Sequence, residues 1–142
     1  MERVDFSGIA DRWLAAFASS ASADLLEKHV TREYNFLWHI FSWNLVPCLE
    51  GDAAREAFDA LEYTSAIMFH FGQRRHGKFV IQNGSFVKKI RAAALDSQLD
   101  VYVTAPDFEW TYVHTHEEIC GPYFCRREAS LSSDQIKEQS ND

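Results

Sequence analysis

The spacing of apolar residues changes near Thr64, and this change limits the folds that the chain can adopt. Before it, Ile9, Trp13 and Phe17 recur every fourth residue, which predicts a helix with one buried face. After it, Ile67, Phe69 and Phe71 stand at every second position, which predicts a strand over residues 65–71. Helices that precede strands are typical of an α+β fold. We therefore expect N-terminal helices packed on a mainly antiparallel sheet of about four strands, with one further helix.

Capping residues set the expected starts of the early helices. Asp5 or Ser7 can cap the first helix, because their side-chain oxygens accept hydrogen bonds from free backbone N–H groups. Ser22 can cap a short second helix, and Asp52 a later one. Residues 32–43 are apolar nearly all round, which predicts a central, buried helix.

Turn residues divide the second half of the chain. Asn83 and Gly84 predict a turn, after which Ser85 can cap the further helix, with Phe86, Ile90 and Ala94 facing inward. The other expected strands are residues 78–81, 99–104 and 108–114.

Length and composition indicate one domain. A chain of 142 residues can bury a core, and we expect a single α+β domain over residues 1–125 with a disordered tail over 126–142. The N-terminus lacks a secretory signal, and no stretch approaches 18 apolar residues, so we expect a cytoplasmic protein without a membrane segment. No glycine-rich nucleotide fingerprint is present, so no cofactor is expected.

Charge is unevenly distributed along the chain. The net charge of −7 argues against nucleic-acid binding. Residues 63–95 nevertheless contain no Asp or Glu. They could form a solvated loop and helix face, or a site for an anion or an acidic partner. The basic residues of this segment are Arg74, Arg75, Lys78, Lys88, Lys89 and Arg91.

The strand predicted over residues 108–114 ends in a histidine pair. If the alternation continues, His114 and His116 project from one face of the strand, where a third ligand could complete a metal site. The chain has no C-x-x-C pair, and no metal site is favoured. The other interpretation is that these histidines hydrogen-bond to backbone or carboxylate groups.

A second group of candidates lies near residue 39. His39 follows Trp38 and could act as a base if a carboxylate oriented it, and Cys48 could then be a nucleophile. Cys48 follows a proline and lacks a helix-start context that would lower its pKa. A hydrogen-bonded core histidine and a buried cysteine are the alternative interpretation.

Several short motifs resemble an uncharacterised family of small bacterial proteins. They are Phe36-Leu-Trp-His-Ile-Phe-Ser42, Cys48-Leu-Glu-Gly51, Ala57-Phe58, Asp100-Val-Tyr-Val103, Trp110-Thr-Tyr-Val113, Thr115-His-Glu117 and Gly121-Pro-Tyr-Phe124. The resemblance covers roughly residues 10–125 and implies a bacterial, intracellular protein, but it implies no reaction. His114 lies outside the motifs. If the motifs converge in space, the expected binding residues are Trp38, His39, Glu50, Trp110, His116 and Glu117.

Two functions follow from these patterns. The absence of a catalytic signature and the surplus of aromatic residues favour a non-catalytic, protein-binding domain of an immunity-like or regulatory kind. The alternative is an enzyme or a small-ligand-binding domain, with or without a metal, whose pocket is rimmed by Trp38 and Trp110. The oligomeric state is not predicted.

Overall fold

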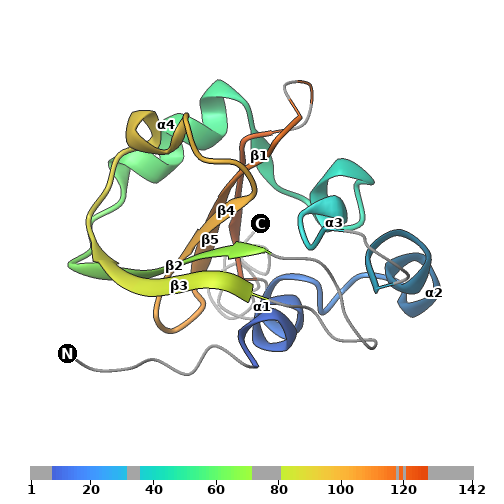
Figure 1. Ribbon diagram of the computed structural model, residues 1–142. Helices are drawn as coiled ribbons and strands as arrows, with labels where there is room; N and C mark the ends of the chain where they lie inside the picture. Colours follow the sequence, from blue (N-terminus) through green and yellow to red (C-terminus); the bar gives the residue numbers. More distant parts are fainter. Residues whose placement is uncertain (1–7, 32–35, 72–80, 118, 120, 128–142) are drawn as a thin grey trace, which may run out of the picture.

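The computed structural model describes residues 8–31, 36–71, 81–117, 119 and 121–127. A six-stranded antiparallel sheet in the order β1-β6-β5-β4-β2-β3 forms its centre. Helices cover both faces of the sheet, with α1 below and α4 above it in Figure 1. The predicted α+β fold is confirmed, and the sheet has six strands where the sequence predicted about four.

The N-terminal helices form one layer. Helix α1 (Ile9–Phe17) buries Trp13 and Phe17, as its spacing predicts. The N-cap residue is Gly8, which has no side chain that could cap the helix. The expected caps Asp5 and Ser7 lie outside the described residues. The hydroxyl of Ser22 accepts a hydrogen bond from N of Leu25 at 3.5 Å, which confirms the predicted cap of the second helix. This helix, α2 (Ala23–Leu26), continues into the π-helical turn η1 (Glu27–Thr31).

The central helix predicted over residues 32–43 is short in the described part of that range, residues 36–43. Only α3 (His39–Ser42) is α-helical, and residues 32–35 lie outside the described part. The chain leaves the helix because Asn44 adopts a left-handed conformation with a φ of 55°. Burial in this region is confirmed, since Trp38 and Ile40 are fully buried.

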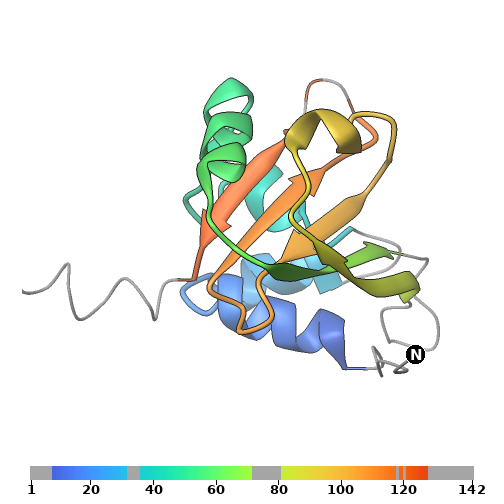
Figure 2. The same cartoon turned by 90° about the vertical axis from the view of Figure 1, so that its left-hand side faces the viewer.

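Helix α4 (Asp52–Ala60) covers the opposite face and buries Ala54 and Phe58. Its N-cap is Gly51 rather than the predicted Asp52, which is the first helical residue. Gly51 has a φ of 66° and a ψ of −137°, a conformation that favours glycine strongly. The one-turn 3₁₀ helix η2 (Ala92–Leu95) packs beside α4 (Figure 2).

The turn at Asn83 and Gly84 and the helix from Ser85 are wrong predictions. Strand β3 (Ile81–Lys88) runs through them and pairs with β2 (Ser65–Phe71), with Asn83 opposite His70 and Gly84 opposite Phe69. A bulge next to His70 absorbs one residue of β3. Cross-strand hydrogen bonds thus override the local turn preference. The predicted strand over 78–81 is described only at Ile81, where β3 begins.

Strands β4 (Val101–Thr104) and β5 (Trp110–His114) confirm the last two predicted strands. Two strands were not predicted, β1 (Leu49–Glu50) and β6 (Tyr123–Arg126), which pair with each other. Of the predicted tail, Arg126 ends β6 and N of Arg127 donates to the carbonyl of Glu109 at 2.8 Å. Residues 128–142 lie outside the described part.

Strand β5 separates two cores. Thr111 and Val113 face the α1 side, where Nε1 of Trp13 donates to Oγ1 of Thr111 at 3.0 Å. Trp110 and Tyr112 face the α4 side, and the ring of Tyr112 stacks on Phe58 with 4.3 Å between centroids. Side chains alternate along a strand, so one short strand supplies both cores. Among the described residues, no helix is both long enough and apolar enough to cross a membrane.

Candidate functional site

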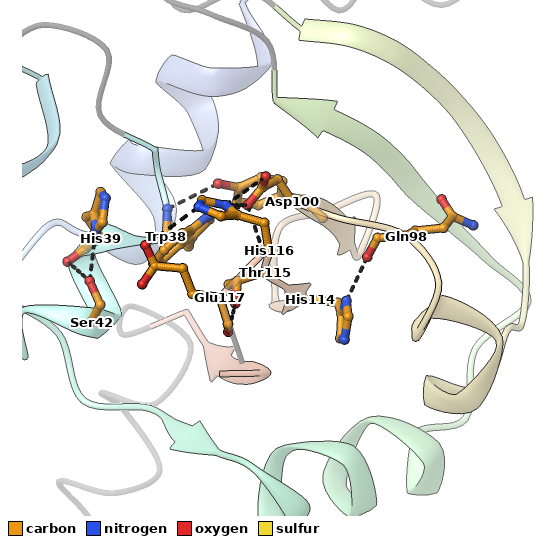
Figure 3. Close-up of polar contacts among 10 residues, drawn as sticks. Trp38, His39, Ser42, Gln98, Asp100, His114, Thr115, His116 and Glu117 are labelled. Atoms are coloured by element: carbon orange, nitrogen blue, oxygen red, sulfur yellow. Dashed lines mark hydrogen bonds and ion pairs between the residues drawn. The ribbon is translucent and has the colours of Figure 1, made fainter. Parts of the chain in front are cut away.

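A mostly buried carboxylate lies directly before β4, next to the loop that follows β5. Asp100 stands just before β4 with a φ of 54°, a left-handed conformation that Asp adopts more readily than most residues. Its Oδ1 accepts hydrogen bonds from Nε1 of Trp38 at 2.9 Å and from N and Nδ1 of His116 at 3.3 and 3.0 Å (Figure 3). The Asp100 side chain is only 14% exposed. Three N–H groups therefore hold this carboxylate in place.

The carboxylate fixes the orientation of His116. An ionised carboxylate only accepts hydrogen bonds, so Nδ1 of His116 carries the proton that it donates to Asp100. Nε2, on the other side of the ring, lies 3.6 Å from Oε1 of Glu117, which is longer than a hydrogen bond. The ring also packs against Phe36 and Trp38, at centroid distances of 5.0 and 5.7 Å. His116 is thus held on three sides and keeps Nε2 available.

The Trp38-His39 pair supports this arrangement from α3. The Trp38 side chain is fully buried, and its backbone N donates to the hydroxyl of Tyr102 at 3.1 Å. The ring of His39 packs on Trp38 with 4.4 Å between centroids, and its Nδ1 lies 2.8 Å from Oγ of Ser42. Burial lowers the pKa of His39, and the nearby Glu117 offsets this only in part. His39 is therefore held in its neutral form at neutral pH.

His114 lies at the end of β5 and makes different contacts. Its Nδ1 donates to the carbonyl oxygen of Gln98 at 2.6 Å, because a carbonyl can only accept. Its Nε2 lies 4.0 Å from Oδ1 of Asp96. The guanidinium of Arg55 hydrogen-bonds to the Asp96 carboxylate through two contacts and thereby lowers the pKa of Asp96.

His114, His116 and Glu117 are among the residues that line a cleft of about 400 Å³. Its walls come from the chain before β4, the end of β5 and the loop before β6. Figure 3 shows Asp100, from the chain before β4, next to His116, from the chain that follows β5. Gly121 in this loop has a φ of 87°, and the bond to Pro122 is cis. The wall includes Asp96, Leu99, His114, His116, Glu117 and Pro122.

The structure brings four of the six predicted binding residues together. Trp38, His39, His116 and Glu117 are mutual neighbours. The other two lie elsewhere. Trp110 lies in the core on the α4 side, with its ring 5.0 Å from that of Tyr63, and Glu50 is exposed on β1, opposite Tyr123. The predicted pocket between Trp38 and Trp110 does not form, because the alternation of β5 places Trp110 on the far face of the sheet.

Comparison with known proteins gives a family but no function. A family model described as a domain of unknown function, DUF4275, matches residues 6–124. The chain belongs to this family. The resemblance inferred from the short motifs is thereby confirmed, and no curated protein and no solved structure matches the chain.

Sequence reasoning did not single out Asp100, the acceptor at the centre of the site in this DUF4275 domain. The residue does open the motif Asp100-Val-Tyr-Val103. A polar residue directly before a buried strand was the available signal, since such a position can turn its side chain toward a loop from another strand. Its partners are 16 and 62 positions away, a pairing that no local pattern encodes.

The structure gives little support to the predicted metal ligands and to the predicted nucleophile. Within the described residues, no group of three or more His, Cys, Asp or Glu side chains is arranged to hold a metal ion. His114 and His116 are each hydrogen-bonded through Nδ1 to separate acceptors. Burial raises the pKa of Cys48 to about 12, with a further contribution from Glu50, so this thiol is a poor nucleophile.

The basic segment is only partly described, because Arg74, Arg75 and Lys78 lie outside the described residues. Lys88 is exposed on β3. Nζ of Lys89 donates to the carbonyls of Asp59 and Leu61 at the end of α4, where a cation complements the helix dipole. Arg91 lies 3.5 Å from the carboxylate of Asp59. Lys89 and Arg91 thus bond to groups at the end of α4. This is a structural role, and it is the alternative to an anion-binding role for these two residues.

Proposed function

We propose that this domain binds a small polar ligand in the cleft, with Nε2 of His116 as the main hydrogen-bonding atom. One observation carries the proposal: Asp100 holds His116 through Nδ1, and Nε2 is left beside Glu117 at the wall of a cleft of about 400 Å³. Pockets for small ligands in proteins have volumes of roughly 300–1,000 Å³ and a few convergent polar groups.

The same geometry suits proton transfer. A histidine whose Nδ1–H is held by a carboxylate keeps a lone pair on Nε2, and the carboxylate stabilises the imidazolium that forms when Nε2 takes a proton. The packing of Phe36 and Trp38 against the ring reduces its freedom to rotate. Binding and proton transfer therefore both depend on the same atom of His116.

A ligand screen with a site-specific readout tests the proposal. Panels of amines, carboxylic acids, sugars and nucleosides are added to the protein, and the imidazole ¹⁵N resonances and the melting temperature are recorded. A ligand of the cleft should shift the Nε2 resonance of His116 and should stabilise the wild type but not His116→Gln. The exposed Glu62 supplies the control variant Glu62→Gln, which should behave as the wild type does. The proposal fails if no panel member moves the His116 resonance, or if every binder stabilises His116→Gln equally.

Protein binding remains a second candidate, and two exposed apolar side chains favour it. Leu99 lines the cleft with 57% of its surface exposed, and Ile119, which lies in the sequence between the lining residues Glu117 and Gly121, is 92% exposed. Apolar side chains around a polar cleft are common at protein interfaces. A photo-crosslinking residue placed at 119 should capture one partner in the source cells, and one placed at the exposed Leu25 should not. Equal capture at both positions would contradict a specific interface.

A further inference from the structure

Two cysteines stand opposite each other where β1 meets β6. The register of these strands pairs Leu49 with Phe124. One position further along, the same register places Cys48 opposite Cys125, and both residues carry thiols. Both side chains belong to the core on the α1 side, because Cys125 is buried within this core and Cys48 packs against it. The two thiols therefore share one face of the sheet.

The hydrogen bonds between the two strands show which kind of pair the cysteines form. N of Gly51 donates to the carbonyl of Pro122 at 2.9 Å, so these two residues form a hydrogen-bonded pair in the same register. Hydrogen-bonded and non-hydrogen-bonded pairs alternate along an antiparallel ladder. Cys48 and Cys125 stand three positions further along and thus form a non-hydrogen-bonded pair. In such pairs the Cα atoms are about 4.5 Å apart and the side chains are closer than in the other kind.

The sulfur of Cys125 lies beside the backbone of Cys48. Its Sγ is 3.7 Å from the carbonyl oxygen of Pro47, whose carbonyl carbon is bonded to N of Cys48. Disulfides join cysteines whose Cα atoms are about 4.4–6.8 Å apart, a range that includes the spacing of a non-hydrogen-bonded pair. The register, the shared face and the position of this sulfur therefore all suit a bond between the two side chains.

We propose that Cys48 and Cys125 form a reversible disulfide when the protein meets a low-molecular-weight disulfide as oxidant. The thiolate of one cysteine attacks a sulfur of the oxidant, breaks its S–S bond and releases one thiolate. The other cysteine then attacks the protein sulfur of this mixed disulfide and releases the second thiolate. The two protein thiols lose two protons and two electrons, which the oxidant takes up as two thiols. Neither cysteine lines the cleft, so this site goes beyond the proposed function.

Burial sets the rate of this reaction, and the fold sets its consequence. Burial and Glu50 raise the pKa of Cys48 to about 12, so little thiolate forms at neutral pH and the exchange is slow. Strand β1 has only two residues and forms one edge of the sheet. A bond next to its end would hold this edge to β6. Because the two cysteines are far apart in the sequence, the bond would also restrict the unfolded chain and stabilise the fold.

A redox titration of the full chain tests the proposal. The folded protein is equilibrated with mixtures of reduced and oxidised glutathione, quenched with acid, alkylated in denaturant and mapped by peptide mass spectrometry. The same titration in concentrated urea gives the reference for the unfolded chain. We expect a peptide pair that links Cys48 to Cys125. The effective concentration of the two thiols should be about 100-fold or more higher in the folded protein than in urea.

The third cysteine of the chain supplies the control variant. Cys120 lies outside the described residues, and Cys120→Ser should form the same linked peptide at the same redox midpoint as the wild type. Oxidation should raise the melting temperature of the wild type and of Cys120→Ser by about 5 °C or more. Cys48→Ser should lose the linked peptide and this rise in melting temperature.

Three results would overturn the proposal. The first is a folded wild type in which Cys120 is linked to another cysteine and Cys48 is not linked to Cys125. The second is the formation of mixed disulfides with glutathione alone. The third is an effective concentration that is equal in the folded and the unfolded chain. The peptide map and the redox midpoint are measured on the wild type, so the test does not depend on the folding of any variant.

Discussion

The indole N–H of Trp38 and the ring N–H of His116 are donated to the same oxygen, Oδ1 of Asp100. Trp38 is fully buried in the core on the α1 side, whereas His116 lies at the cleft. One carboxylate oxygen therefore connects the packing of the core to the orientation of a candidate binding group. A change at Asp100 should alter stability and ligand binding together.

Replacement of this carboxylate by an amide is the first test. Asn tolerates the left-handed backbone of Asp100, so Asp100→Asn isolates the loss of charge. Because charge-assisted hydrogen bonds become neutral ones, we expect the free energy of unfolding to fall by about 1–2 kcal/mol. Urea titration measures it, and Glu62→Gln should change it by less than about 0.5 kcal/mol. An unchanged midpoint for Asp100→Asn would show that the shared acceptor contributes little.

A buried hydrogen bond between α1 and β5 gives a second prediction. Nε1 of Trp13 donates to Oγ1 of Thr111 at 3.0 Å, and both side chains are fully buried. Thr111→Val leaves the indole N–H without its acceptor, and we expect a loss of about 1–3 kcal/mol in unfolding free energy. Thr111→Ser keeps the hydroxyl and should lose less. Equal losses for the two variants would point to packing rather than to the hydrogen bond.

The two glycines that precede helices differ in backbone conformation. Gly51 before α4 has a φ of 66°, and Gly8 before α1 has a φ of −104°. Neither has an atom within 4 Å of an added Cβ, so space is the same for both. We expect Gly51→Ala to cost about 1–3 kcal/mol because of the strained φ, and Gly8→Ala to cost much less. Thermal unfolding monitored by circular dichroism compares them, and similar losses would contradict the argument.

His39 should make stability depend on pH. Burial lowers its pKa in the folded protein below the ordinary histidine value of 6.5, so the unfolded chain binds the proton more readily. The contribution of His39 to stability is therefore complete above about pH 6.5 and declines as the pH falls through that value toward the folded pKa. Urea titrations at several pH values should show a shallower decline for His39→Gln. Parallel curves for the two proteins would rule out this role.

Cys48 should react slowly with alkylating reagents. With a pKa of about 12, a very small fraction of its thiol is ionised at neutral pH, and the thiolate is the reactive form. Peptide mass spectrometry after iodoacetamide treatment should find Cys48 largely unmodified in the folded protein and modified in urea. Because Glu50 also raises this pKa, Glu50→Gln should speed the reaction. Rapid alkylation of the folded wild type would contradict the burial of this thiol.

The sequence predicts the helices and strands in which one buried face sets the spacing of the apolar residues. Ile9, Trp13 and Phe17 define α1, because one helical face is buried and the other is not. The same holds for the strand predicted over residues 65–71, which β2 matches at both ends. Local patterns fail where a distant partner decides the structure. The turn residues Asn83 and Gly84 form a strand because β2 supplies their hydrogen bonds.

The candidate site follows the same rule. The sequence identifies His116, Glu117 and Trp38 by residue type and motif, and the structure brings them together. It cannot identify Asp100 as their shared partner, because no periodicity relates residues that stand just before α3, just before β4 and just after β5. The sequence also led to the wrong prediction that Trp110 lies near Trp38. The core that a strand residue faces depends on where the neighbouring strands and helices lie.

The alternation of β5 has a consequence for how faithfully the sheet assembles. A slip of one position against β4 would carry Trp110 and Tyr112 into the core of α1, and Thr111 and Val113 into the core of α4. Bulky rings would then meet a space shaped for small side chains, and two hydroxyl or branched groups would leave a void around Phe58. A slip in the register of β5 would therefore destabilise the packing of both cores at once. The correct register is favoured from both faces of the sheet.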